Sequence, residues 1–103
     1  MKDRCHDEAV AEMFARDPAF AVEFLNEVLA DGDHAELLVA LRQLSKVHGG
    51  MARVAERADL NATQLYRALS PAGNPELRSL TAILRAMGLR LAVQRLSGER
   101  ERR

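Results

Sequence analysis

Apolar side chains recur at every third or fourth position over much of the chain, which is the spacing of one face of an α-helix. The first such stretch predicts a short helix over residues 6–16. A second helix is expected to begin at Asp17 and Pro18, because aspartate supplies a cap oxygen and proline tolerates the first helical position. This helix is expected to end at Asp31 and Gly32. Its predicted apolar face consists of Phe20, Phe24, Leu25, Val28 and Leu29.

A third helix is predicted to follow at once. Asp33 is placed to cap it, and Glu36, three residues later, matches an acidic variant of the capping box. Gly49 and Gly50 are expected to end it, because glycine adopts the left-handed conformation of helix ends without steric cost. Its predicted apolar stripe consists of Leu37, Leu38, Leu41, Leu44 and Val47.

The second half of the chain continues the helical pattern. Two short helices are predicted over residues 51–58 and 62–69, and a final helix is expected to begin at Asn74 and Pro75 and to end at Gly88. The apolar stripe of that final helix is Leu77, Leu80, Ile83, Leu84 and Met87.

The pattern changes after this helix, because residues 89–95 alternate between apolar and polar side chains and predict one short strand. The chain offers no second strand to pair with it. The strand is therefore expected to pair with a second copy or a partner, and an irregular tail packed on the core is the competing interpretation.

The length of 103 residues is that of about one domain. We expect a single helical domain over residues 1–96 and a disordered charged tail over residues 97–103. No apolar run is long enough to span a membrane, and the polar N-terminus does not resemble a secretory signal. A single cysteine, Cys5, forms no internal disulfide, and this fits a cytoplasmic protein.

Charge is distributed unevenly along the chain, although the formal net charge is zero. Residues 1–48 contain five Lys or Arg against ten Asp or Glu, whereas residues 49–103 contain ten Arg against five Asp or Glu. An arginine-rich half suggests a polyanionic partner. The alternative is two solvated surfaces that happen to differ in charge.

The segment over residues 51–69 carries the candidate chemistry. Two short helices that cross steeply need a small residue at the crossing, and Ala55 is placed to supply it. The inner face of such a unit would consist of Val54, Ala58, Leu60, Leu65 and Leu69. The outer face of the second helix, capped by Asn61, would present Ala62, Thr63, Tyr66 and Arg67. Small polar groups at a helix start, followed by a hydroxyl and a guanidinium, suit entry into the major groove of DNA, where Arg67 would bond guanine or phosphate.

This segment resembles a helix-turn-helix of the lambda-repressor-like (Xre-type) class, which implies an all-α bundle of about five to six helices with the short C-terminal strand. The chain departs from that class at the turn, because Asp59 occupies a position that is usually glycine. Aspartate tolerates left-handed backbone better than most residues, so the turn remains allowed.

Three further stretches resemble the small addiction-module antidote proteins, the HigA-like group of antitoxins. They are Asp17-Pro-Ala-Phe-Ala-Val-Glu-Phe-Leu-Asn26 with Asp31-Gly-Asp33, Leu65-Tyr-Arg-Ala-Leu-Ser-Pro-Ala-Gly-Asn-Pro75, and Ala86-Met-Gly-Leu-Arg-Leu91. The resemblance covers about residues 17–95. It implies an antitoxin that blocks a RelE/HigB-like mRNA-cleaving toxin and represses its own operon by binding double-stranded operator DNA, usually as a homodimer.

The resemblance also implies the site. Carried onto this chain, the DNA-binding residues are Arg53, Asn61, Ala62, Thr63, Gln64, Tyr66, Arg67 and Asn74. Arg53 departs from the glutamine that relatives often have there, which leaves a phosphate contact open. Asn74 is included because helix N-termini favour phosphate.

The acidic half suggests a second interface. Glu23 and Glu27 are candidate toxin-binding residues, because a toxin that holds RNA presents a basic surface. A solvated helical face is the alternative interpretation.

No pattern of catalytic or metal-binding residues accompanies these motifs. Cys5, His6 and Asp7 are adjacent and lack zinc spacing, and no Ser/His/Asp or Cys/His set or glycine-rich phosphate loop is present in the sequence. We therefore expect no enzyme, metal or cofactor. Two other functions stay open: a stand-alone Xre-type regulator, and a protein-interaction module that has lost DNA binding, for which the carboxylates of Glu56 and Asp59 would argue.

Overall fold

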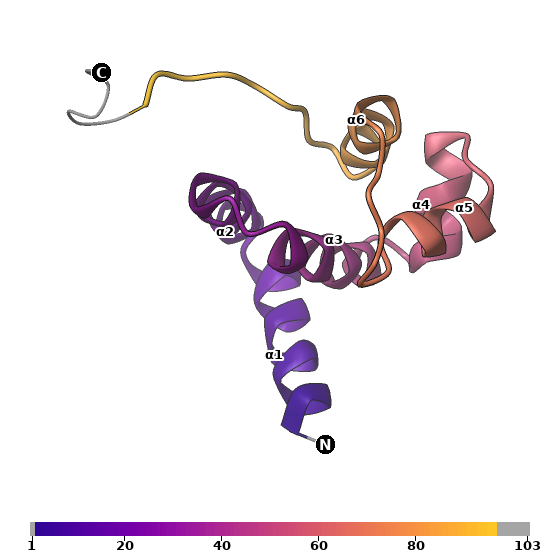
Figure 1. The fold of residues 1–103 in the computed structure, drawn as a ribbon. Helices are drawn as coiled ribbons and strands as arrows, with labels where there is room; N and C mark the ends of the chain where they lie inside the picture. The colour runs from indigo at the N-terminus through magenta and orange to yellow at the C-terminus, as the bar shows by residue number, and fades with distance from the viewer. Residues whose placement is uncertain (1, 97–103) are drawn as a thin grey trace.

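The computed structural model describes residues 2–96, and over these residues it contains six helices and no strand (Figure 1). The helices are α1 (Lys2–Arg16), α2 (Pro18–Asp31), α3 (His34–Val47), α4 (Met51–Ala58), α5 (Ala62–Ala68) and α6 (Leu77–Ala86). The predicted all-helical architecture is confirmed. The expected tail over residues 97–103 lies outside the described residues.

The helices pack around two centres. α3 contacts α1, α2 and α4, and α4 in turn contacts α5 and α6. Figure 1 shows α1 extending away from the other helices toward the N-terminus, with α4 and α5 at the far end of α3 from α2. The largest fully buried side chains are Leu38, Leu41, Leu65, Leu69, Ile83, Val54 and Ser45.

An aromatic cluster joins the first two helices. The buried Phe14 of α1 lies with its ring centroid 5.7 Å from that of Phe20 and 5.6 Å from that of Phe24. Such offset and edge-on pairs add to the stabilisation from apolar burial. α1 begins at Lys2, four residues earlier than the periodicity predicted.

The predicted helix ends on α2 and α3 are confirmed. The Asp17 side chain accepts a hydrogen bond from the Phe20 N–H at 3.3 Å, and Asp33 accepts one from the Glu36 N–H at 3.1 Å. Gly32 ends α2 with a φ of 73°. A capping box was expected at Asp33 and Glu36. The hydrogen bond that is observed is the one accepted by the Asp33 side chain.

The start of the last helix was predicted wrongly. α6 begins at Leu77, with Glu76 at its N-cap and no capping side chain, so Asn74 and Pro75 lie in the preceding loop. Contacts far apart in sequence hold that loop: His34 Nε2 of α3 lies 2.9 Å from the Gly73 carbonyl oxygen, and Arg42 donates to the carbonyl of Leu69.

Two predicted core residues are instead exposed. Leu29, expected on the buried face of α2, is 47% exposed, and Leu77, expected in the stripe of α6, is 69% exposed. Leu77 is exposed because it lies at the first turn of the later-starting helix.

The short strand expected over residues 89–95 does not form in the single chain. α6 is followed by Met87 and by Gly88, whose φ is 81°. Beyond Leu89 the segment runs extended but makes no strand ladder, since the described residues offer no second strand.

Asp59 provides a direct test of the turn between α4 and α5, because its φ of 60° is left-handed. We expect Asp59→Gly to raise the free energy of unfolding by about 0.5–1 kcal/mol, and Asp59→Ala to lower it by about 1 kcal/mol, because only glycine adopts this conformation without a Cβ clash. Asp59→Asn, which tolerates the same backbone, is the matched control and should change little. Thermal unfolding followed by circular dichroism measures all three, and an alanine variant as stable as the glycine variant would contradict the assignment.

Candidate nucleic-acid interface

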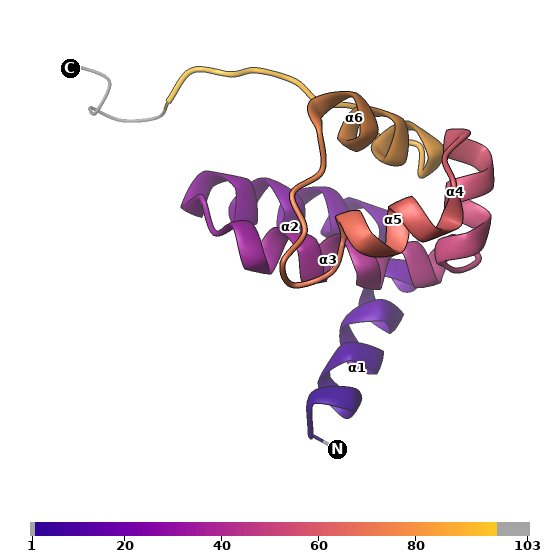
Figure 2. The same cartoon turned by 45° about the vertical axis from the view of Figure 1, so that its right-hand side comes forward.

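The pair α4 and α5 is built around a close crossing. Ala55 is 1% exposed, and Val54 and Leu65 are fully buried, so the two helices meet through small and apolar side chains, as predicted. The left-handed Asp59 lets the Leu60 N–H reach the Ala55 carbonyl at 2.8 Å and so closes α4. Figure 2 shows α5 beneath α6, with α4 next to one end of both helices.

The start of α5 has a complete capping box. The Asn61 Oδ1 accepts hydrogen bonds from the N–H groups of Thr63 at 2.8 Å and Gln64 at 3.3 Å, and the Asn61 N–H donates to Gln64 Oε1 at 3.4 Å. The predicted cap is therefore confirmed. The capping box uses the side-chain oxygens of Asn61 and Gln64 as acceptors within the helix start. The groups of these two side chains that remain for a ligand are therefore mainly their NH2 donors.

The outer face of α5 presents the groups that sequence predicted there. Ala62, Thr63, Tyr66 and Arg67 are all exposed, and Tyr66 is exposed by 56%. Among the side chains that the structure describes, no carboxylate lies within salt-bridge distance of Arg67. The hydroxyls of Thr63 and Tyr66 and the guanidinium of Arg67 are thus all exposed on one short, capped helix.

Arg53 lies on the first turn of α4 and is exposed. Its side chain passes over Gly49, where an added Cβ would come within 3.0 Å of the Arg53 Cγ. Gly49 therefore leaves room for the Arg53 side chain.

Asn74 does not lie where its predicted role requires. Because α6 begins two residues later than predicted, with Glu76 as its N-cap, Asn74 is an exposed loop residue and not a helix N-terminus, so the helix-dipole argument for a phosphate contact does not apply to it.

Two residues that the sequence did not single out position the Asn74 loop. They are His34 and Arg42, through the contacts to Gly73 and Leu69 described above. His34 is 39 residues from Gly73, and Arg42 is 27 residues from Leu69. No local sequence motif predicts contacts between residues so far apart.

The acidic residues of α2 lie together at a separate groove. A cavity of about 300 Å³ is lined by Phe20, Glu23, Phe24, Glu27, Val28, Asp31 and Glu36. Glu23 and Glu27 are exposed, whereas the two phenylalanines of its lining are partly buried. We refer to it below as the acidic groove. α2 makes no contact with α4 or α5, so the groove and the outer face of α5 are distinct surfaces.

Two other kinds of site are absent from the described residues. Among the residues that the structure describes, no three or more His, Cys, Asp or Glu side chains form a cluster that could bind a metal ion. No helix within residues 2–96 has the length and apolar character needed to cross a membrane.

Comparison with known proteins identifies the family. A sequence profile described as "Probable addiction module antidote protein" matches residues 7–95. A protein of Haemophilus influenzae (strain ATCC 51907 / DSM 11121 / KW20 / Rd), described as "Uncharacterized protein", is 29% identical over 94 residues, covering 91% of this chain and 95% of that protein. No solved structure matches the chain. Because the profile spans nearly the whole of the helical structure, the chain belongs to the addiction module antidote family.

Proposed function

We propose that the chain is a DNA-binding antitoxin of a type II toxin–antitoxin module, which neutralises a RelE/HigB-like mRNA-cleaving toxin and represses its own operon as a homodimer. The observation that carries the DNA-binding part is the outer face of α5. Thr63, Tyr66 and Arg67 stand exposed there on a helix whose N-terminus is capped by its own side chains.

In this proposal the α4–α5 pair is a lambda-repressor-like helix-turn-helix. α4 crosses the DNA backbone, and α5 lies in the major groove with its N-terminal residues toward base edges. Thr63 and Arg67 lie one turn apart, so both can face the same groove. Arg53, on the preceding helix, is placed for a phosphate contact.

The toxin-binding part of the proposal rests on the acidic groove. A ribonuclease that holds RNA carries cations on its surface. A groove lined by both apolar side chains and carboxylates suits lysine and arginine, whose stems are apolar and whose heads are charged. Glu23 and Glu27 are the proposed contacts.

The DNA-binding proposal predicts a loss on Arg67→Ala. We expect binding to DNA from upstream of the reading frame to weaken about 10- to 100-fold, because a base or phosphate contact from arginine is lost. Fluorescence anisotropy measures it at two salt concentrations, with a scrambled duplex for comparison and Arg16→Ala, an exposed arginine of α1, as the matched control.

Binding to the upstream duplex that exceeds binding to the scrambled one, and that falls with added salt, supports the proposal. Equal and weak binding of both duplexes would contradict it and would favour a protein-interaction module.

The toxin-binding proposal predicts that the double variant Glu23→Lys, Glu27→Lys fails to co-purify with the toxin encoded beside it and fails to restore growth of cells that express that toxin. Charge reversal places like charges at the contact. Both side chains are exposed, so the circular dichroism spectrum should be unchanged.

Glu76→Lys, an exposed charge reversal in the arginine-rich half, is the control and should leave co-purification intact. Undiminished toxin binding by the double variant would contradict the assignment of the acidic groove. The lack of any adjacent toxin reading frame would instead favour a stand-alone regulator.

A further inference from the structure

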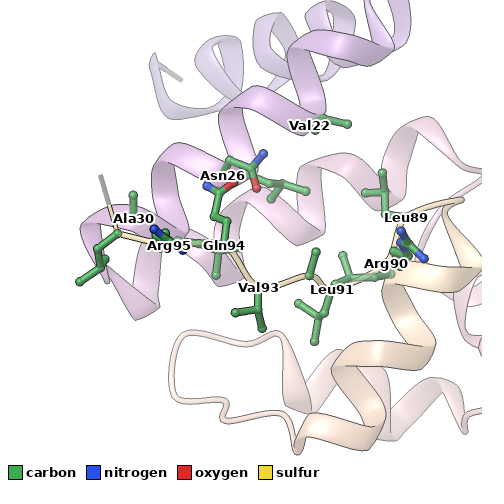
Figure 3. A pocket seen from close by; sticks show the side chains of 14 residues that line it. Val22, Asn26, Ala30, Leu89, Arg90, Leu91, Val93, Gln94 and Arg95 are labelled. Carbon is green, nitrogen blue, oxygen red and sulfur yellow. The ribbon is translucent and has the colours of Figure 1, made fainter. Parts of the chain in front are cut away.

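The segment that follows α6 lies beside α2 without filling the space between them. Residues 89–96 run alongside α2 and leave a groove of about 670 Å³, with Val22, Asn26 and Ala30 on the α2 side (Figure 3). Leu89 and Leu91 are partly buried against the core, so the segment is attached at its start. From Ala92 onward every described residue is exposed.

The backbone of this segment is unpaired. The Leu89 N–H donates to the Leu84 carbonyl at 2.8 Å, but from Arg90 to Leu96 no backbone hydrogen bond to another described residue is formed. The free N–H and C=O groups of such an extended stretch can pair with a strand of another chain, as those of a sheet edge do.

Exposed apolar side chains gather at the same place. Within the described residues, seven large hydrophobic side chains are exposed, and four of them line this groove. These four are Val22 (42% exposed), Leu29 (47%), Val93 (98%) and Leu96 (72%). In Figure 3 Val93 points away from α2, so its own chain provides nothing to cover it. Clustered exposure of this kind marks an interaction site.

We propose that a second copy of the chain covers this surface, and that the two 89–95 segments pair as an antiparallel two-stranded ribbon centred on Ala92 and backed by α2 of each copy. This inference rests on the homodimer in the proposed function and names its interface. The structure favours a second copy because the segment is complementary to itself.

The alternating side chains select the register. With Ala92 opposite its own copy, Leu91 lies opposite Val93, and all seven residues 89–95 pair. Arg90 then lies opposite the neutral Gln94. A slip by one residue would place Arg90 opposite Arg95 and would mix the apolar and polar faces, which costs stability on both counts.

Backing by a helix is required, because an isolated two-stranded ribbon is marginally stable in water. α2 supplies it through Val22 and Leu29 on the face that carries Ala92, whereas Leu91 and Val93, on the opposite face, cover each other across the two strands. The acidic groove shares no lining residue with this one, so a chain that pairs with its copy retains Glu23 and Glu27 for the toxin.

The inference is tested on the full chain without DNA or toxin, by sedimentation over a range of concentrations. We expect a dimer, and the double variant Ala92→Pro, Val93→Pro should weaken it by about tenfold or more, because proline removes ladder donors while fitting an extended backbone. Leu77→Ala, which truncates an exposed apolar side chain outside the groove, is the control and should dimerise normally.

Disulfide cross-linking tests the register. In a Cys5→Ser background, Ala92→Cys should form a covalent dimer on mild oxidation, because opposed residues of antiparallel strands have Cα atoms about 4.5–5.5 Å apart, within the range of a disulfide. Arg85→Cys, an exposed position on α6, is the control and should not cross-link.

Three results would overturn the inference. A dimer that withstands the two prolines uses another surface, which leaves the proposed homodimer in place. A monomeric chain refutes both the ribbon and the homodimer, while DNA and toxin binding keep their own tests. A monomer whose 89–96 amides become protected from hydrogen exchange only when toxin is added shows that the segment pairs with the toxin instead.

Discussion

The structure depends on the burial of one row of side chains along α3. Leu38 and Leu41 are fully buried, and the helix that carries them contacts α1, α2 and α4. The row includes the buried Ser45, whose hydroxyl donates to the Leu41 carbonyl at 2.8 Å and lies 3.9 Å from the Met87 sulfur. A polar group at the centre of the core is thus satisfied within its own helix, and it links α3 to the end of α6. Removal of apolar volume from this row would loosen the packing of α1, α2 and α4 on α3 at once.

Because α3 is shared, it also sets the positions of both proposed surfaces. α2, with the acidic groove, packs on one part of α3, and α4 leads from the other part to α5. The polar side of α3 adds a second support, since Arg42 donates to the carbonyl of Leu69 at the end of α5. A cation at a helix C-terminus interacts favourably with its exposed carbonyls. The outer face of α5 is therefore held from beneath by apolar burial and from its end by a charged side chain.

Features set by neighbouring residues could be predicted from sequence, and features set by distant contacts could not. The caps at Asp17, Asp33 and Asn61 and the left-handed turn at Asp59 each involve residues within about one turn of helix, and all four were predicted. Exposure of the α5 face followed from the same helical periodicity. The start of α6 was missed, and the loop before it makes a contact with His34 from 39 residues away that no local pattern predicts. The mutual bonds of the α5 capping box were also missed, although Gln64 follows Asn61 at the same spacing as Glu36 follows Asp33.

Two further errors share a location. Periodicity placed Leu29 in the core and residues 89–95 in a strand, and in the single chain neither prediction is met. Both lie at the groove between α2 and the C-terminal segment. Apolar periodicity reports which side chains are selected for burial, but it does not say whether the burying surface belongs to the same chain. When two independent patterns, one helical and one alternating, fail at one groove, the simplest common cause is a missing partner there. The same patterns are satisfied together if a second 89–95 segment completes the ribbon and encloses Leu29.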